Sequence, residues 1–383
     1  YIGWLMHGPI GGVMAGVLFV LPGVAAIMAL SVLYALFGGI DAVDGLLFGL
    51  QAAVVAVVIE AVLRIGRRTL RTSAHLALAA AAFVAIFFLQ VPFPLIVVGA
   101  GLIGFVGGRA RPALFRSAGL HATGDATRGI VIADDGAGMT RATSGAALRS
   151  SGVALVLWLV PVAVVAAVLG SASVFTQEAV FFSKSAVVTF GGAYAVLAYI
   201  AQAAVDSYGW LRPGEMLTGL GLAETTPGPL IMVVQFVGFM AAFRNPGPLA
   251  PLTAGVLGSL LVTWVTFVPC FFFIFAGAPF IERLRGHRGL TATLSAITAA
   301  VVGVVLNLAV WFALHTVFGQ VHVSRLLGLR LLRPDPSSVD VAAVLLAAFA
   351  TVAIFRLKWS VTRTLGVSAA LGLVVALTTR VGT

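Results

Sequence analysis

The chain has 383 residues, of which 60% are hydrophobic and only 9% charged, and its mean hydropathy is +1.10. About a quarter of the residues of an ordinary soluble domain are charged, so this composition excludes a soluble globular protein and predicts one embedded in a bilayer. The net charge of +10 comes mostly from arginines in short runs between apolar segments, a pattern typical of cytoplasmic loops and not of a nucleic-acid-binding face.

The chemistry of metals and disulfides is not indicated. Cys270 is the single cysteine, so the chain has no intrachain disulfide, and the six histidines never fall at a spacing such as HxxxH. We therefore expect no metal site and no cofactor.

The first part of the chain contains four apolar segments. Residues 9–37 form a long one, interrupted at Pro22, and residues 44–63 form a second that ends in an arginine-rich loop (Arg64, Arg67, Arg68 and Arg71). Residues 74–89 and 93–107 are shorter and are separated by Pro92-Phe93-Pro94, which predicts a hairpin. The arginines place the loop after residue 63 in the cytoplasm.

The second part follows a change of composition. Residues 117–150 are rich in Gly, Ala, Thr, Asp and Arg and predict a mobile cytoplasmic linker between a first membrane part, 1–116, and a second, 151–383. In the second part a crossing at 151–169 precedes a broken region, 173–243, in which Gly and Pro interrupt every apolar stretch. Further apolar segments are expected at 249–276, 291–317, 340–355 and 364–380.

The two parts resemble each other. Gln51–Glu60 matches Thr298–Asn307, and at the same offset Pro22 falls on Pro269; further along, Val84–Phe87 matches Val352–Phe355. Their shared order predicts a duplication, and the basic loops indicate that the halves run in opposite directions. The expected fold is thus an all-α polytopic membrane protein with two homologous halves, an inverted repeat, and broken or re-entrant helices.

The repeat also indicates an absence. Tyr1 aligns with Phe236, so the first half has no counterpart of residues 173–235, and the chain does not begin with Met. We expect an N-terminally incomplete first repeat.

Two sequence stretches in the broken region are candidate substrate sites. In Lys184–Tyr194, glycines interrupt an apolar segment and predict a helix start whose free amides bind an oxyanion, although glycines also simply permit close helix packing. In Ala223–Leu230, Thr226 is a natural N-cap and Pro227 a natural first helical residue. The candidate substrate-binding residues are Lys184, Phe190, Gly191, Gly192, Ala193, Tyr194, Thr225, Thr226, Pro227, Gly228 and Pro229.

Four polar residues are candidates for coupling or gating: Glu215, Glu224, Glu60 and Asn307. Charged residues in a membrane domain are functional candidates by default. Lys184 and Glu224 either form an ion pair that substrate opens, or Lys184 neutralises an anion while Glu224 carries a proton; snorkelling to an interface is the plainer alternative. Hydrogen bonding within the bundle is the plainer reading of Glu60 and Asn307.

Long strings of the second part resemble the chromate ion transporter family. They include Phe190–Tyr194, Tyr208–Leu211, Gly219–Leu230, Thr263–Cys270, Gly277–Gly286 and Asn307–Phe312. The resemblance implies a bacterial inner-membrane protein of two homologous halves that exports chromate and confers chromate resistance. It also implies that the glycine and proline motifs matter for transport, whereas the matching motifs of the first half would lie before Tyr1.

The expected partners are therefore chromate or sulfate and the lipid bilayer, with a homodimer as the candidate assembly and no nucleic acid. Three alternatives stay open: a transporter of sulfate or another oxyanion, an inactive truncated remnant, and a membrane enzyme acting on lipid-linked substrates. The last is disfavoured because the broken region holds no histidine cluster, so we expect no enzyme.

Overall fold

We describe the protein from a computed structural model, which covers residues 2–115, 144–189, 192–212, 214–277, 288–326 and 329–381. The first part forms α1 (Ile2–Phe37), α2 (Asp41–Thr69), α3 (Ser73–Phe87) and α4 (Phe93–Ala110), followed by a short 3-10 helix, Pro112–Phe115. These helices confirm the four apolar segments expected there. The hydroxyl of Thr72 accepts from the amide of His75 and caps α3, and Pro94 lies in the first turn of α4.

One expectation for α1 is wrong. Its helix continues through Pro22, and the non-helical backbone lies instead at His7 and Gly8, where Gly8 has a φ of 62°. The residue before a proline avoids the helical region, and Gly8 precedes Pro9. Within a membrane helix, a proline such as Pro22 is tolerated because the freed backbone groups find other partners.

The second part is helical with one β-hairpin. It comprises α5 (Ser144–Leu169), α6 (Val174–Val187), α7 (Ala193–Gln202) with a π-helical turn (Ala203–Ser207), α8 (Glu215–Thr225), a 3-10 turn (Leu230–Met232), α9 (Val233–Arg244), α10 (Pro251–Gly277), α12 (Arg288–Val317), β1 (Val321–Leu326), β2 (Leu329–Pro334), a 3-10 turn (Pro336–Ser338), α13 (Val341–Phe355) and α14 (Val361–Val381). The short helices α6 to α9 confirm the broken region. Helix α5 begins seven residues before the expected crossing at 151, and residues 117–143 of the expected linker lie outside the described ranges.

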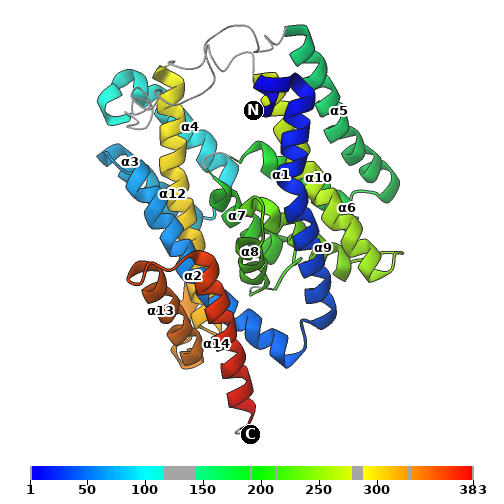
Figure 1. Ribbon diagram of the computed structural model, residues 1–383. Helices are drawn as coiled ribbons and strands as arrows, with labels where there is room; N and C mark the ends of the chain where they lie inside the picture. Colours follow the sequence, from blue (N-terminus) through cyan, green and yellow to red (C-terminus); the bar gives the residue numbers. More distant parts are fainter. Residues whose placement is uncertain are drawn as a thin grey trace.

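Seven helices within the described ranges are long and apolar enough to cross a bilayer: α1, α2, α4, α5, α10, α12 and α14. In the most apolar stretch of α12, 72% of the residues are buried, against 11% in α1 and in α5. Helix α12 is therefore mostly buried, whereas α1 and α5 leave many apolar side chains exposed; α5 lies at the edge of the molecule in Figure 1. These features agree with the expected polytopic all-α class.

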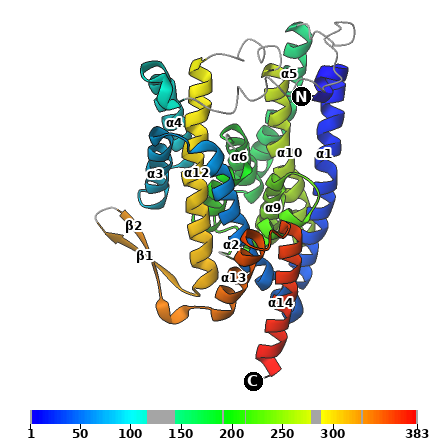
Figure 2. The same cartoon turned by 60° about the vertical axis from the view of Figure 1, so that its left-hand side comes forward.

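In each part, two consecutive helices pack against one long helix of the other part. Helix α2 packs against α13 and α14, and α12 packs against α3 and α4 (Figure 2). The contacts use small residues at matching places: Gly372 of α14 lies against the backbone of Gly45 and Gly49, and Gly104 of α4 lies against Ala296 of α12. In the sequence repeat, Gly49 falls on Ala296 at the offset that relates Gln51–Glu60 to Thr298–Asn307, and Gly104 falls on Gly372 at the offset that relates Val84–Phe87 to Val352–Phe355. Small residues allow such close approach of membrane helices.

Candidate functional site

Two breaks in the helices of the second part lie next to each other at the centre of the molecule. The first precedes α7, where Gly192 has a φ of 123° and stands at the N-cap position. The second follows α8, where Gly228 has a φ of 129°. Both backbones lie in a region that side chains rarely adopt, so glycine suits both positions. Helices α7 and α8 lie between α1 and α12 in Figure 1.

The capping role expected of Thr226 is wrong. Thr226 is the C-cap of α8, with a φ of −100° and a ψ of 151°, and the next helical turn begins only at Leu230. The hydroxyl of Thr226 donates to the carbonyl of Ala223 at 3.1 Å, and that of Thr225 donates to Leu222 at 2.8 Å. Pro227 is thus not the first helical residue, because the chain bends at residues 226–228 and is extended at Pro229 before the next turn begins.

A side-chain hydrogen bond joins the two breaks. The hydroxyl of Tyr194, in the first turn of α7, donates to Oε1 of Glu224, in the last turn of α8. Both side chains are partly buried. The two stretches that the sequence singled out separately therefore form one site, which we call the break site: Gly192, Ala193, Tyr194, Glu224, Thr225, Thr226, Pro227, Gly228 and Pro229.

Helix α2 adds an ion pair to the break site. Nε of Arg64 donates to Oε1 of Glu60 at 2.8 Å, one turn away on the same helix. Arg64 also interacts electrostatically with Tyr194 and Glu224. Glu60 therefore belongs to the polar surroundings of the break site, and Arg64, which the sequence analysis used only to place a loop, is a positive charge that acts on Glu224.

Helix α1 closes the break site from another side. The Cα of Gly23 lies 3.1 Å from the position that a Cβ on Gly228 would occupy, and a Cβ on Gly23 would lie 3.2 Å from the carbonyl oxygen of Pro227. The amide of Gln235, in α9, donates to the carbonyl of Val24 at 3.0 Å. The loop after α8 is thus packed on the middle of α1 just after Pro22.

Not every candidate residue reaches this site. Lys184 is exposed in the last turn of α6 and forms no ion pair with Glu224. Asn307 lines a separate pocket. Phe190 and Gly191 lie outside the described residues.

Glu215 belongs to a different cluster, at the start of α8. Its carboxylate accepts from both Nη atoms of Arg244, from the Tyr34 hydroxyl at 3.0 Å and from the Arg212 amide at 2.7 Å. Arg244 ends α9, so this clamp ties the beginning of one short helix to the end of the next and to α1. Four donors saturate an ionised carboxylate.

Glu178 was missed by the sequence reading. It lies fully buried in α6, neither carboxylate oxygen has a hydrogen-bond partner among the described residues, and one oxygen faces Gly258 of α10. The signal was present, because a single acidic residue in an apolar stretch of a membrane domain is unusual.

The break site offers donors for an anion. The amides at the start of α7 have no acceptor within their helix, and a helix start carries partial positive charge. Among the described residues, none accepts from the amides of Gly228 or Leu230. The described residues contain no group of three or more His, Cys, Asp or Glu side chains placed to hold a metal ion.

The family described as chromate transporter matches residues 1–105 and 176–374. The chain is 30% identical over 310 residues to a chromate transport protein of Pseudomonas aeruginosa, an overlap of 80% of this chain and 64% of that protein. It is 22% identical over 318 residues to a chromate transport protein of Cupriavidus metallidurans (83% and 68%), and 22% identical over 311 residues to a probable chromate transport protein of Synechococcus elongatus (81% and 68%). The chain thus spans about two thirds of the length of these curated relatives. No solved structure gives a significant match.

Proposed function

The chain belongs to the chromate transporter family, and we propose that it is a secondary transporter that exports chromate across the bacterial inner membrane and so confers chromate resistance. The observation that carries this proposal is the hydrogen bond from Tyr194 to Glu224. It brings two glycine-containing helix breaks together in the interior of a multi-pass membrane protein. Broken helices that meet in this way are a recurring way to build transporter binding sites.

Substrate binding in this proposal uses the backbone. Chromate is a tetrahedral dianion, and the amides at the start of α7 and at Gly228 and Leu230 are donors without a described acceptor. Such donors hold an oxyanion by charge-assisted hydrogen bonds. Arg64 supplies a positive charge, since it already interacts electrostatically with Glu224 and Tyr194. Lys184, which is exposed in the last turn of α6, is proposed to attract the anion towards the break site.

Coupling in this proposal belongs to Glu224. A dianion and the carboxylate of Glu224 repel each other at short distance, so protonation of Glu224 favours the loaded site and its loss favours release. Glu215 instead holds α8 to α9, because its four hydrogen bonds leave it no free position for a proton. Asn307 and Glu60 lie at matching positions of the sequence repeat. Glu60 adjoins the break site and Asn307 lines the pocket beside the other end of α7, and both are proposed to act in gating.

The direction of transport is proposed from the membrane potential. Moving two negative charges out of a negative cytoplasm is favoured by about 4.6 kcal/mol per 100 mV. The reciprocal packing of α2 on α13 and α14, and of α12 on α3 and α4, supports two halves related as an inverted repeat that rock around the break site. A homodimer is the assembly that we propose for the membrane.

The test is chromate flux into proteoliposomes that contain the purified protein, with protein-free liposomes as the reference. We expect saturable flux that rises with an imposed potential of the favourable sign. Glu224→Gln should abolish the dependence of the flux on pH, whereas Asp44→Asn, which changes an exposed carboxylate at the start of α2, should keep it.

Three results would oppose the proposal. Flux equal to that of protein-free liposomes would refute transport. Unchanged pH dependence in Glu224→Gln would remove the coupling role of that residue. Sulfate that competes more strongly than chromate itself would assign the site to sulfate.

A further inference from the structure

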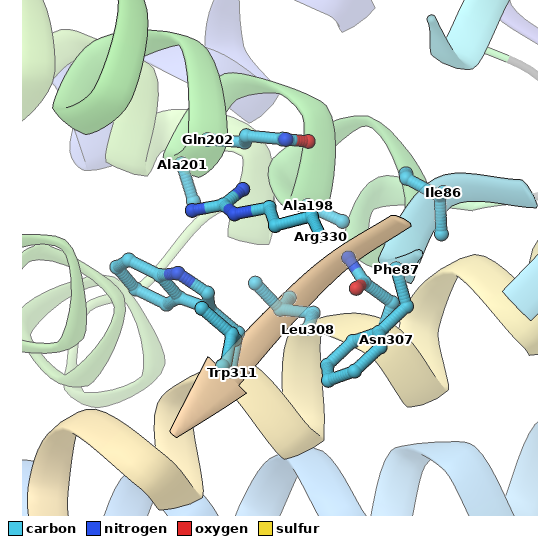
Figure 3. A pocket seen from close by; sticks show the side chains of 10 residues that line it. Ile86, Phe87, Ala198, Ala201, Gln202, Asn307, Leu308, Trp311 and Arg330 are labelled. Carbon is cyan, nitrogen blue, oxygen red and sulfur yellow. The ribbon is translucent and has the colours of Figure 1, made fainter. Parts of the chain in front are cut away.

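A second polar pocket lies beside the other end of α7, away from the break site. Four elements line it: the end of α3, the second half of α7, the second half of α12 and strand β2 (Figure 3). The polar side chains among its lining residues are Gln202, Asn307, Trp311 and Arg330. Figure 3 shows the guanidinium of Arg330 between Gln202 and the indole of Trp311, with the amide of Asn307 on the other side of the pocket.

The β-hairpin builds this pocket. Strand β2 reaches across to the end of α3, where the amide of Arg330 donates to the carbonyl of Phe88 at 2.8 Å. The same residue sends its side chain inward, where only 12% of it remains exposed. The backbone hydrogen bond therefore fixes the position of Arg330, and its charged side chain lies in the interior and not on the surface of a loop.

The pocket contains hydrogen-bond donors without partners. Trp311 is 6% exposed, and its Nε1 has no acceptor among the described residues. Nε of Arg330 is also buried without a described acceptor. A buried polar group that lacks a partner destabilises the fold, and more so when it is charged. An acceptor that enters between these two residues would offset that destabilisation.

Two charged or titratable groups accompany Arg330. Its Nη2 lies 3.1 Å from Oδ2 of Asp206, in the π-helical turn after α7. The ring of His315 packs on that of Trp311 with centroids 4.2 Å apart, and His315 interacts electrostatically with Asp206 and Arg330. Asp206 thus occupies only one edge of the guanidinium.

The carbonyls at the end of α7 do not oppose an anion here. A helix end carries partial negative charge, but the carbonyl of Ala203 accepts from the amide of Tyr208, and that of Ala204 accepts from Trp210 and Leu211. The pocket lies along the side of α7, at Ala198, Ala201 and Gln202.

The repeat gives this pocket a counterpart. At the offset that relates the two parts, Asn307 falls on Glu60 and Trp311 on Arg64. Glu60 and Arg64 border the break site at the start of α7, whereas their counterparts on α12 border the pocket further along the same helix. Equivalent positions of α2 and α12 therefore each place a pair of polar side chains beside α7, one pair near its start and the other near its end.

We propose that the pocket formed by Arg330, Trp311, Gln202 and Asn307 binds a small inorganic oxyanion and is a second station for the substrate, beside α7. The Nε edge of Arg330 and the Nε1–H of Trp311 donate to the anion, and the two amide side chains complete the donors. That the pocket binds an oxyanion does not depend on the proposed transport function. That it is a station for the substrate does rest on that function. In the proposed topology it lies on the side of the membrane opposite the arginine loop, where exported anion leaves.

The test uses Trp311 as a local probe in the full chain, purified into lipid nanodiscs and titrated with sodium sulfate. Sulfate should change the tryptophan emission of the wild type in a saturable manner, and Trp311→Phe should lose that change. Arg330→Gln should raise the half-saturating concentration roughly tenfold or more, because it removes a charge-assisted hydrogen bond. Arg333→Gln, at an exposed position of the same strand, is the matched control and should titrate like the wild type.

Asp206→Asn separates binding from a purely structural ion pair. If Arg330 serves the anion, removing its competitor should tighten sulfate binding about threefold or more. If the ion pair only holds the hairpin in place, Asp206→Asn should raise the half-saturating sulfate concentration as Arg330→Gln does, and that result would overturn the proposal. A wild-type titration without saturable change, or one that Arg330→Gln leaves intact, would overturn it too. A protein that titrates in this way but carries no chromate would refute the transport function and support the pocket as a binding site.

Discussion

The clamp between Glu215 and Arg244 gives the sharpest prediction for stability. Glu215 has 8% of its side chain exposed and Arg244 has 28%. Arg244→Met removes two of the four hydrogen bonds to the carboxylate, together with its counter-charge. The Tyr34 hydroxyl and the Arg212 amide remain as its donors.

The expected cost follows from that arrangement. Breaking a buried ion pair costs about 3–5 kcal/mol, because one charge is left without compensation. Partial exposure of Arg244 lets water screen the remaining charge, so we expect the free energy of unfolding to fall by about 2–3 kcal/mol. Glu215→Gln should cost less, since Arg244 can turn to solvent, and the double variant should lose less than the sum of the two single variants.

The assay is the melting temperature in detergent, followed by size-exclusion chromatography of heated samples. Arg244→Met should lower that temperature by roughly 5 °C or more, while Arg71→Met, at an exposed arginine after α2, should leave it unchanged. Additive losses in the double variant, or equal melting of Arg244→Met and Arg71→Met, would show that the pair does not clamp α8 to α9.

Three further predictions concern packing and the break site. Gly303→Leu should abolish the folded protein in detergent extracts, because a Cβ there would overlap the backbone of α3, whereas Gly99→Leu has open space and should be extracted normally; equal yields would contradict the packing of α12 on α3. Gly228→Ala should lower chromate flux more than Gly247→Ala, since both have positive φ but only the first is packed against α1; the reverse order would count against the break site. Glu178→Met should leave the free energy of unfolding unchanged or raise it by up to about 1–2 kcal/mol, because the carboxylate it replaces has no described partner. A large fall in the melting temperature would show that the carboxylate is paired.

The membrane helices were predictable because their signal is local. A run of apolar residues long enough to cross a bilayer, ended by arginines or prolines, is visible without knowledge of its neighbours. The same is true of the breaks at Gly192 and Thr226, where Gly and Pro interrupt apolar runs. What the breaks contact was not predictable, because the bond from Tyr194 to Glu224 joins residues that are distant in sequence.

Other features were missed for identifiable reasons. The alternation of apolar and polar residues in Val321–Leu326 is typical of a strand, but only helices and loops were expected in this chain. Arg64 was also interpreted only as a loop marker, although its spacing of four residues from Glu60 favours an ion pair on one helix face. Thr226 has the residue type of an N-cap, but the chain bends at residues 226–228 and no helix begins at Pro227, so Thr226 caps the preceding helix instead.

The central claim is that the substrate occupies the break site, and protection of an introduced thiol tests it most directly. In a Cys270→Ala background, Thr226→Cys is labelled in nanodiscs by a membrane-permeant maleimide with and without saturating sulfate, and Thr362→Cys, exposed on α14, serves as the control. The account predicts that sulfate slows labelling at position 226 severalfold and leaves position 362 unchanged. Equal rates with and without sulfate at position 226, at concentrations that saturate transport, would contradict it.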